Sequence, residues 1–193
     1  MSADAGAVSP WLLRWAHLIT RGGSVLDVAA GSGRHTRWLA ERGHGVTAID
    51  RDAAAMQALA DCAETLVADI ERDPWPLDGR RFDAVLVTNY LWRPLLPTLV
   101  AATAPGGVFL YETFASGNER VGRPARPDFL LLRGELLGAV PGLRIVAYEE
   151  GFLDDPKRFV QRIVAVRELA TDLPARHRLV GPDGEAGSLE STG

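Results

Sequence analysis

The chain has 193 residues, of which 47% are hydrophobic and 24% charged, with a formal net charge of −4 at pH 7. This is the composition of an ordinary globular protein, and its acidic balance gives no general attraction to nucleic acid or to anionic membranes. A single cysteine excludes an intramolecular disulfide and a multi-cysteine zinc site, and no apolar run approaches the ~20 residues of a membrane helix.

The first half of the chain alternates short apolar runs with helical segments. Residues 1–9 are small and polar, and we expect them to be flexible. Ser9 and Pro10 open a helix, because serine is a favoured N-cap and proline suits the first helical position. Strands are expected at 24–30, 45–50, 64–69 and 82–90, with helices at 33–43 and 51–63.

The second half continues this alternation and then departs from it. A helix is expected over 94–102 and a strand over 108–114, with the turn "APGG" between them. The long loop 115–128 carries three arginines and leads to a helix expected at 129–140. Two alternating strands, 143–152 and 158–169, follow, and the Gly-, Pro- and charge-rich segment 170–193 is expected to be a disordered tail.

This order of elements predicts one α/β domain over residues 10–169. The expected fold is a doubly wound, Rossmann-like sheet, mostly parallel, with helices on both faces and an antiparallel C-terminal edge strand. Right-handed crossovers place ligands at the carboxyl ends of the parallel strands, beside the first one. Functional residues are therefore expected where the strands end.

The stretch "VLDVAAGSGRH" (25–35) joins the first strand to its helix. A dinucleotide fingerprint requires a third glycine where this chain has Thr36, and a phosphate loop requires a lysine that is absent here. Asp27 would repel a pyrophosphate but attract an ammonium group. Free N–H groups at the helix start near Gly33 suit a carboxylate. The turn therefore favours an amino acid over a phosphate.

Two further acids end the next strands. Asp50 can accept hydrogen bonds from both hydroxyls of a ribose, and capping of the following helix is the alternative role. Asp69, after the third strand, can present an acceptor to an adenine amino group. An ammonium, a carboxylate, a ribose and an adenine together describe S-adenosylmethionine.

Five ordered motifs resemble the class I S-adenosylmethionine-dependent methyltransferases, in particular the small tellurite-resistance-type and ubiquinone-biosynthesis-type members. These are "VLDVAAGSG", "AID", "VAD", "FDAVLVTNY" and "APGGVFLYETF". Many relatives carry glycine at the position of Ala29, and we expect this small residue to be tolerated. "TNYLWRP" stands in place of the Asn-Pro-Pro-aromatic motif, which argues against methylation of adenine, cytosine or glutamine amino groups.

The resemblance implies which residues surround S-adenosylmethionine, or S-adenosylhomocysteine as the product. Asp27 would reach the ammonium directly or through water, and the backbone from Ala29 to Gly33 would hold the methionine part. The complete expected set is Asp27, Ala29, Ala30, Gly31, Gly33, Asp50, Arg51, Asp69, Ile70, Thr88 and Asn89.

The acceptor side is expected on connections at the same edge of the sheet. Methyl transfer needs a general base only if the nucleophile arrives protonated. His35 and Tyr90 are the candidates, although an exposed histidine in a helix's first turn is an equally good interpretation of His35. Tyr90, Arg93, Arg120, Arg123 and Arg126 are expected to bind a small anionic or soft-nucleophile acceptor; a solvated, arginine-rich loop is the alternative.

We therefore expect a cytoplasmic methyltransferase of small molecules, monomeric or homodimeric, without a metal, nucleic-acid or membrane partner. The N-terminus shows neither the basic nor the apolar region of a secretory signal. The main alternative is a non-catalytic S-adenosylmethionine-binding module or partner subunit. Asp27 and Thr36 disfavour a nicotinamide-dependent oxidoreductase.

Overall fold

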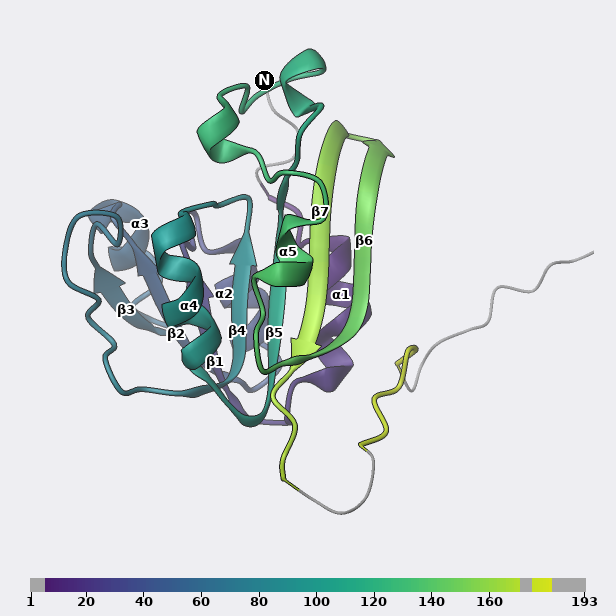
Figure 1. Cartoon of the computed structure of the whole chain (residues 1–193). Coiled ribbons are helices and arrows are strands. Elements are labelled where there is room, and N and C mark those ends of the chain that lie inside the picture. The colour runs from purple at the N-terminus through teal and green to yellow at the C-terminus, as the bar shows by residue number, and fades with distance from the viewer. Residues whose placement is uncertain (1–5, 171–174, 182–193) are drawn as a thin grey trace, which may run out of the picture.

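A computed structural model describes residues 6–170 and 175–181 (Figure 1). Outside the described residues lie 1–5, 171–174 and 182–193, which belong to the two segments expected to be flexible or disordered. A seven-stranded sheet runs in the order β3-β2-β1-β4-β5-β7-β6. The strands are β1 (Ser24–Val28), β2 (Gly45–Asp50), β3 (Glu64–Val67), β4 (Phe82–Thr88), β5 (Thr103–Phe114), β6 (Arg144–Asp154) and β7 (Lys157–Val166).

Strands β1 to β5 pair in parallel, whereas β7 pairs antiparallel with both β5 and β6. The expected mostly parallel sheet is confirmed, and the antiparallel C-terminal edge strand that was expected is present as an antiparallel edge pair, β7 with β6. The last strand of the chain, β7, lies between β5 and β6, so β6 forms the edge.

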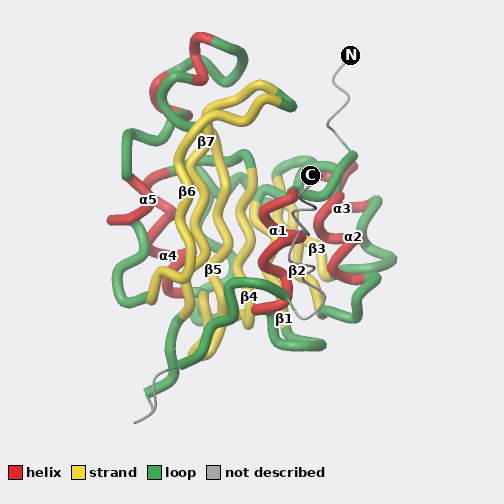
Figure 2. Tube along the Cα trace, turned by 90° about the vertical axis from the view of Figure 1, so that its right-hand side faces the viewer, coloured by secondary structure: helices red, strands yellow, loops and turns green. Residues whose placement is uncertain are grey.

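Helices cover both faces of the sheet, as expected. Figures 1 and 2 show α1 to α3 on one face and α4 with α5 on the other. No helix among residues 6–170 and 175–181 is long and apolar enough to cross a membrane. The helices are α1 (Pro10–Trp15), α2 (Arg34–Ala40), α3 (Ala53–Gln57), α4 (Leu96–Ala101) and α5 (Glu135–Gly138), and the 3₁₀ turns are η1 (Ala16–Leu18), η2 (Arg93–Leu95), η3 (Asn118–Arg120) and η4 (Pro127–Phe129).

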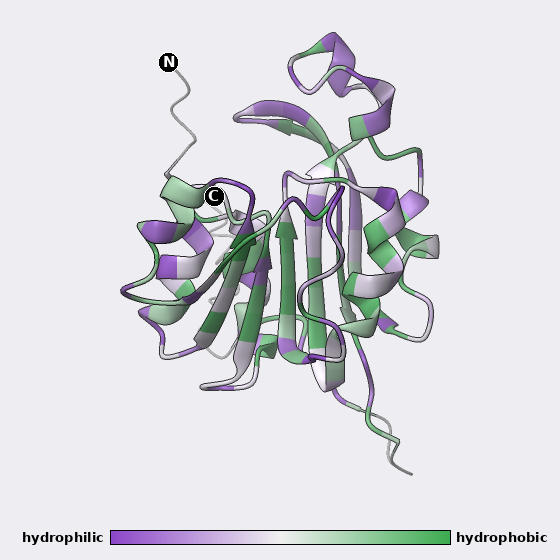
Figure 3. Ribbon diagram, turned by 90° about the vertical axis from the view of Figure 1, so that its left-hand side faces the viewer, coloured by the Kyte–Doolittle hydropathy of each residue, from purple (hydrophilic) through white to green (hydrophobic). Residues whose placement is uncertain are grey.

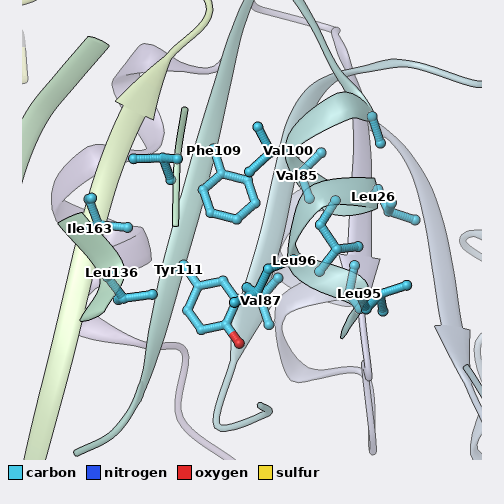
Figure 4. Packing of buried hydrophobic residues seen from close by; sticks show 14 of the residues in the cluster. Leu26, Val85, Val87, Leu95, Leu96, Val100, Phe109, Tyr111, Leu136 and Ile163 are labelled. Carbon is cyan, nitrogen blue, oxygen red and sulfur yellow. The ribbon is translucent and has the colours of Figure 1, made fainter. Parts of the chain in front are cut away.

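The central strands are buried on both faces, and this explains their continuous apolar sequence. In β4, Val85 and Val87 pack under α4. Ala84 and Leu86 pack on the opposite face of the sheet, in the cluster that contains Trp11 of α1. Figure 4 shows the first of these layers, and Figure 3 shows the hydrophobic strands between more polar connections. The carboxyl ends of β1, β2 and β4 are thereby fixed at one edge.

The prediction of a helix over 129–140 is wrong for most of that range. The chain first makes η4, then Leu131 pairs with Ala115 as an isolated bridge, and only the four residues of α5 are helical. Gly134 has φ 70° at the N-cap of α5, a conformation that a continuous helix does not contain. Residues 115–131 therefore form an excursion between β5 and α5, which rises above the carboxyl ends of the strands in Figure 1.

Candidate functional site

Two cavities lie at the carboxyl ends of β1, β2 and β4. The acidic cavity, of about 360 Å³, is lined by Ala29, Asp50, Arg51, Ala68, Asp69, Ile70, Glu71, Tyr90 and Phe129. The glycine-turn cavity, of about 190 Å³, is lined by Ala29, Ala30, Gly31, Ser32, Arg34, His35, Thr88 and Asn89. Because Ala29 lines both, the two cavities meet at the turn that follows β1.

This turn contains three residues in the left-handed region. Ala29 has φ 53°, Gly31 φ 55° and Gly33 φ 78°. A side chain at Gly31 would point into open space, whereas one at Gly33 would overlap the side chain of Leu59. Gly31 therefore faces the cavity, and Gly33, which lines neither cavity, allows the turn to pack against the segment after α3.

Asp27 lies in β1, beneath the turn. Its side chain is only 1% exposed and does not line either cavity, and its Oδ2 accepts a 2.6 Å hydrogen bond from the Thr36 hydroxyl. Burial raises the pKa of this carboxyl to about 6, although hydrogen bonds from Thr36 oppose the shift. Thr36, at the position of the third fingerprint glycine, thus satisfies a buried acid directly behind the turn.

Asp50 connects the end of β2 to the turn. Its Oδ2 accepts from the backbone N–H of Gly31 and its Oδ1 from that of Asp52, each at 2.9 Å. The capping alternative for Asp50 is wrong, because Asp52 caps α3 by accepting from two backbone N–H groups. Each carboxylate oxygen of Asp50 retains a lone pair, and the side chain lines the acidic cavity.

The acidic cavity also contains residues that the sequence did not single out. Glu71 donates its backbone N–H to Asp69 Oδ1 at 3.2 Å, and Phe129 reaches the cavity from η4. Nothing in the sequence pattern points to Phe129, because its position depends on the course of residues 115–131.

Tyr90 closes the other side of the acidic cavity. Its hydroxyl is buried and has no hydrogen-bond partner among the residues that the structure describes. Burial and the nearby Glu71 raise its pKa well above the usual value. Tyr90 is therefore protonated at neutral pH, which disfavours it as a general base.

His35 is 2% exposed, so its interpretation as an exposed residue of a first turn is wrong. Its Nε2 accepts from the backbone N–H of Ser9 at 3.2 Å, and its Nδ1 lies 3.3 Å from Oγ1 of Thr88. Burial, and then the neighbouring Arg34, lower the pKa of His35 to about 4. The ring is therefore neutral at pH 7.

Asn89 directly follows β4 and lies beside these residues. It has φ 54°, and its backbone N–H donates to the carbonyl of Glu112 at 2.9 Å. Asparagine adopts this left-handed conformation more readily than most residues. The structure therefore brings Thr88 and Asn89 together with the glycine turn.

Arg93 forms its hydrogen bonds with other groups of the protein. Its guanidinium forms a bidentate pair with Glu135, at 2.6 and 2.9 Å, and donates to the carbonyls of Asp128 and Leu130. It lines neither cavity. It acts as a clamp that holds η4 and α5 against η2, a long-range role that a local motif does not reveal.

The other three candidate arginines lie exposed on the excursion of residues 115–131. Arg126 pairs with Asp128 at 2.8 Å, and its guanidinium lies over the ring of Phe129 at 5.1 Å. Neither it nor Arg120 or Arg123 lines the acidic or the glycine-turn cavity. The structure places them outside the cavities, on the segment that supplies Phe129.

Comparison with known proteins supports the predicted relationship. Residues 25–107 match the family model described as a methyltransferase domain. Over 103 residues the chain is 35% identical to malonyl-[acyl-carrier protein] O-methyltransferase of Salmonella typhimurium, covering 49% of this chain and 40% of that protein. The match confirms the family resemblance drawn from the motifs.

Solved structures show the same fold. TehB from Haemophilus influenzae superposes with a TM-score of 0.71 at 20% identity, over 86% of this chain and 64% of that one. A TehB-like S-adenosylmethionine-dependent methyltransferase from Corynebacterium glutamicum gives 0.61 at 20% identity, over 85% and 90%. The chain thus spans less than two thirds of both the Salmonella and the Haemophilus proteins.

Proposed function

We propose that this chain, whose residues 25–107 belong to the class I S-adenosylmethionine-dependent methyltransferases, transfers a methyl group to a small-molecule acceptor. The observation that carries the proposal is the junction of two cavities at Ala29. One cavity is lined by acids that end strands, and the other by the glycine turn after β1 together with His35, Thr88 and Asn89.

The residues present fit S-adenosylmethionine. Asp50 keeps an acceptor site on each carboxylate oxygen for a ribose, and Asp69 with Ile70 would hold the adenine in the acidic cavity. The glycine-turn cavity would hold the methionine part, with the carboxyl of Asp27 behind it as the negative charge that favours an ammonium. A positive-φ turn lined by Gly31 leaves room for this close approach.

When bound, the cofactor supplies an activated methyl group on a sulfonium ion. The protein's task is then to hold the acceptor in line and to exclude water. Phe129 and Tyr90 offer apolar rings at the acidic cavity, and the exposed guanidinium groups of the 115–131 excursion would attract an anion. These features favour an anionic or soft nucleophile, such as a chalcogen oxyanion, thiol, carboxylate or hydroxyl.

Calorimetric titration with S-adenosylhomocysteine tests cofactor binding. We expect binding in the micromolar range, and Asp50→Ala should weaken it at least tenfold because both the ribose contact and the anchor of Gly31 are lost. Asp52→Ala is the matched control, since it removes a helix cap and leaves the cavity unchanged. No binding by the unmodified protein at high micromolar ligand would refute the proposal.

Release of S-adenosylhomocysteine over a panel of acceptors then separates an enzyme from a non-catalytic binding module. The proposal places the protein in the cytoplasm, with a small-molecule substrate, no nucleic-acid partner, and a monomeric or homodimeric state. Light scattering on the purified chain tests the last point.

A further inference from the structure

Both ring nitrogens of His35 have partners that constrain the position of its proton. Nε2 lies 3.2 Å from the backbone N–H of Ser9 and 3.3 Å from Nε of Arg34. An amide N–H and a guanidinium N–H can only donate. Nε2 must therefore carry a lone pair, and a neutral His35 ring carries its proton on Nδ1.

This proton points toward Thr88 at the end of β4. The 3.3 Å distance between Nδ1 and Oγ1 makes the threonine oxygen the acceptor. A hydroxyl that accepts from His35 still has its own proton to donate. Thr88 lines the glycine-turn cavity, and its hydroxyl proton is therefore available to a ligand there.

Ser9 is held in place by contacts other than the one to His35. Its side chain, 5% exposed, caps α1 by accepting from Trp11 and donates to Oε1 of Glu112 at 3.2 Å. Glu112 is itself buried and faces Arg162 at 3.3 Å and Arg158 at 3.7 Å. The donor that faces His35 thus belongs to a buried helix start. The charged group that contacts the ring is Arg34 on α2, and Glu112 on β5 contacts Ser9 on the far side of that donor.

We propose that Ser9 and Arg34 fix His35 as the Nδ1–H tautomer, so that Thr88 donates a hydrogen bond to an anionic oxygen in the glycine-turn cavity. His35 is then a positioning residue and not a general base. The naming of the ligand rests on the proposed function, and the oxygen belongs either to the cofactor's carboxylate or to the methyl acceptor.

The fixed proton of His35 restricts which methyl acceptors can react. With His35 unable to receive a proton, an acceptor that arrives ionised can use its own electron pair to form the bond to carbon. No proton then has to be removed. This favours carboxylates, thiolates and oxyanions over neutral alcohols and protonated amines.

The tautomer can be measured directly in the ligand-free protein. Long-range ¹H–¹⁵N spectra of ¹⁵N-histidine-labelled full chain, assigned with His35→Asn, should show a protonated Nδ1 and an unprotonated Nε2 from about pH 5.5 to 8. An Nε2–H tautomer, or a ring that titrates near the usual histidine pKa, would overturn the proposal whether or not the protein binds S-adenosylhomocysteine.

A matched pair of substitutions isolates the Ser9 N–H group. Ser9→Ala removes the hydroxyl and keeps the N–H, whereas Ser9→Pro removes both, at a φ of −56° that proline adopts. We expect Nε2–H signals for His35 to grow in Ser9→Pro relative to Ser9→Ala. Equal tautomer populations in two folded variants would overturn the role of Ser9, and if Ser9→Pro does not fold, the spectrum of the unmodified protein decides.

Binding and kinetics identify which oxygen accepts from Thr88. An asparagine amide at position 35 places a donor near the Nδ1 position, and a glutamine amide places it near Nε2. His35→Gln should therefore lose on the order of tenfold more than His35→Asn, either in affinity for S-adenosylhomocysteine or in kcat/KM for the acceptor. A loss in S-adenosylhomocysteine affinity assigns the oxygen to the cofactor, and a loss in kcat/KM for the acceptor assigns it to the acceptor. Equal losses in the two variants would overturn the proposal. Disappearance of the acidic limb of the kcat/KM profile in both variants would also overturn it, because that limb is the signature of a general base.

Discussion

The hydroxyl of Thr36 donates to the buried carboxylate of Asp27 across 2.6 Å, and both side chains are at most 1% exposed. This pair connects the first strand to the first turn of α2. It also explains why this chain has a threonine where a dinucleotide-binding protein has a glycine. The Thr36 hydroxyl donates to a buried acid, which a glycine cannot do.

The pair makes the stability of the protein depend on pH. The pKa of Asp27 is about 6 in the folded chain against 3.8 for an unperturbed carboxyl, so ionisation above pH 6 costs the folded state on the order of 3 kcal/mol. This cost disappears as the pH falls from 6 to about 4, because only the folded chain then binds the proton. The change in unfolding free energy caused by Asp27→Asn should therefore be more favourable at pH 7.5 than at pH 4.5, as measured by urea unfolding. Equal effects at both pH values would contradict the shift.

The same carboxyl should make ligand binding depend on pH. Under the proposed function, the ligand's ammonium favours the ionised form of Asp27. The affinity for S-adenosylhomocysteine is expected to rise between about pH 5 and 7 and then to level off, with release of a proton near pH 6. Calorimetry in two buffers of different ionisation enthalpy detects that proton. Asp27→Asn should bind more weakly and lose this proton release.

Gly31 and Gly33 form a matched pair for separating packing from ligand contact. Both have positive φ, but only a side chain at Gly33 would overlap Leu59. Gly33→Ala should lower the unfolding free energy by about 2–4 kcal/mol, and Gly31→Ala by about 1–2 kcal/mol from backbone strain alone. Chemical denaturation measures both. Equal destabilisation would show that the overlap relaxes at no cost.

Arg93 is expected to contribute to stability rather than to acceptor binding. Arg93→Ala breaks four hydrogen bonds and should cost about 1–3 kcal/mol, and Arg93→Lys should not restore this loss because lysine lacks the planar fork. The exposed Arg126→Ala is the control and should change thermal stability little. If Arg93→Ala were as stable as Arg126→Ala, the clamp would be refuted.

The parallel half of the fold could be predicted because it follows from local patterns. Strands buried on both faces are continuous apolar runs, and acids that end such strands must meet at one edge. Asp50, Asp69 and the glycine turn therefore line adjoining cavities at the expected positions. The predicted residues that line these cavities lie within residues 25–90, at or shortly after the ends of β1 to β4.

The remaining features depend on contacts between distant parts of the chain. His35 is buried because Ser9, 26 residues earlier, packs onto it, and Arg93 is occupied by Glu135, 42 residues later. Leu131 is buried in the core and pairs with Ala115 as an isolated bridge, whereas the same leucine run suggested a helix. No periodicity records such contacts, so the surroundings of His35, Arg93 and residues 115–131 could not be predicted in the same detail.

The excursion of residues 115–131 leaves the sheet after β5 and is fastened by the Leu131 bridge and by Arg93. It carries the exposed arginines and Phe129 but supplies none of the residues of the glycine turn. Exchange of residues 115–131 between homologues would therefore change the arginine-bearing surface and the Phe129 wall of the acidic cavity, and it would leave the glycine turn unchanged. A fold arranged in this way can vary one wall of its cavities while the turn after β1 is inherited intact.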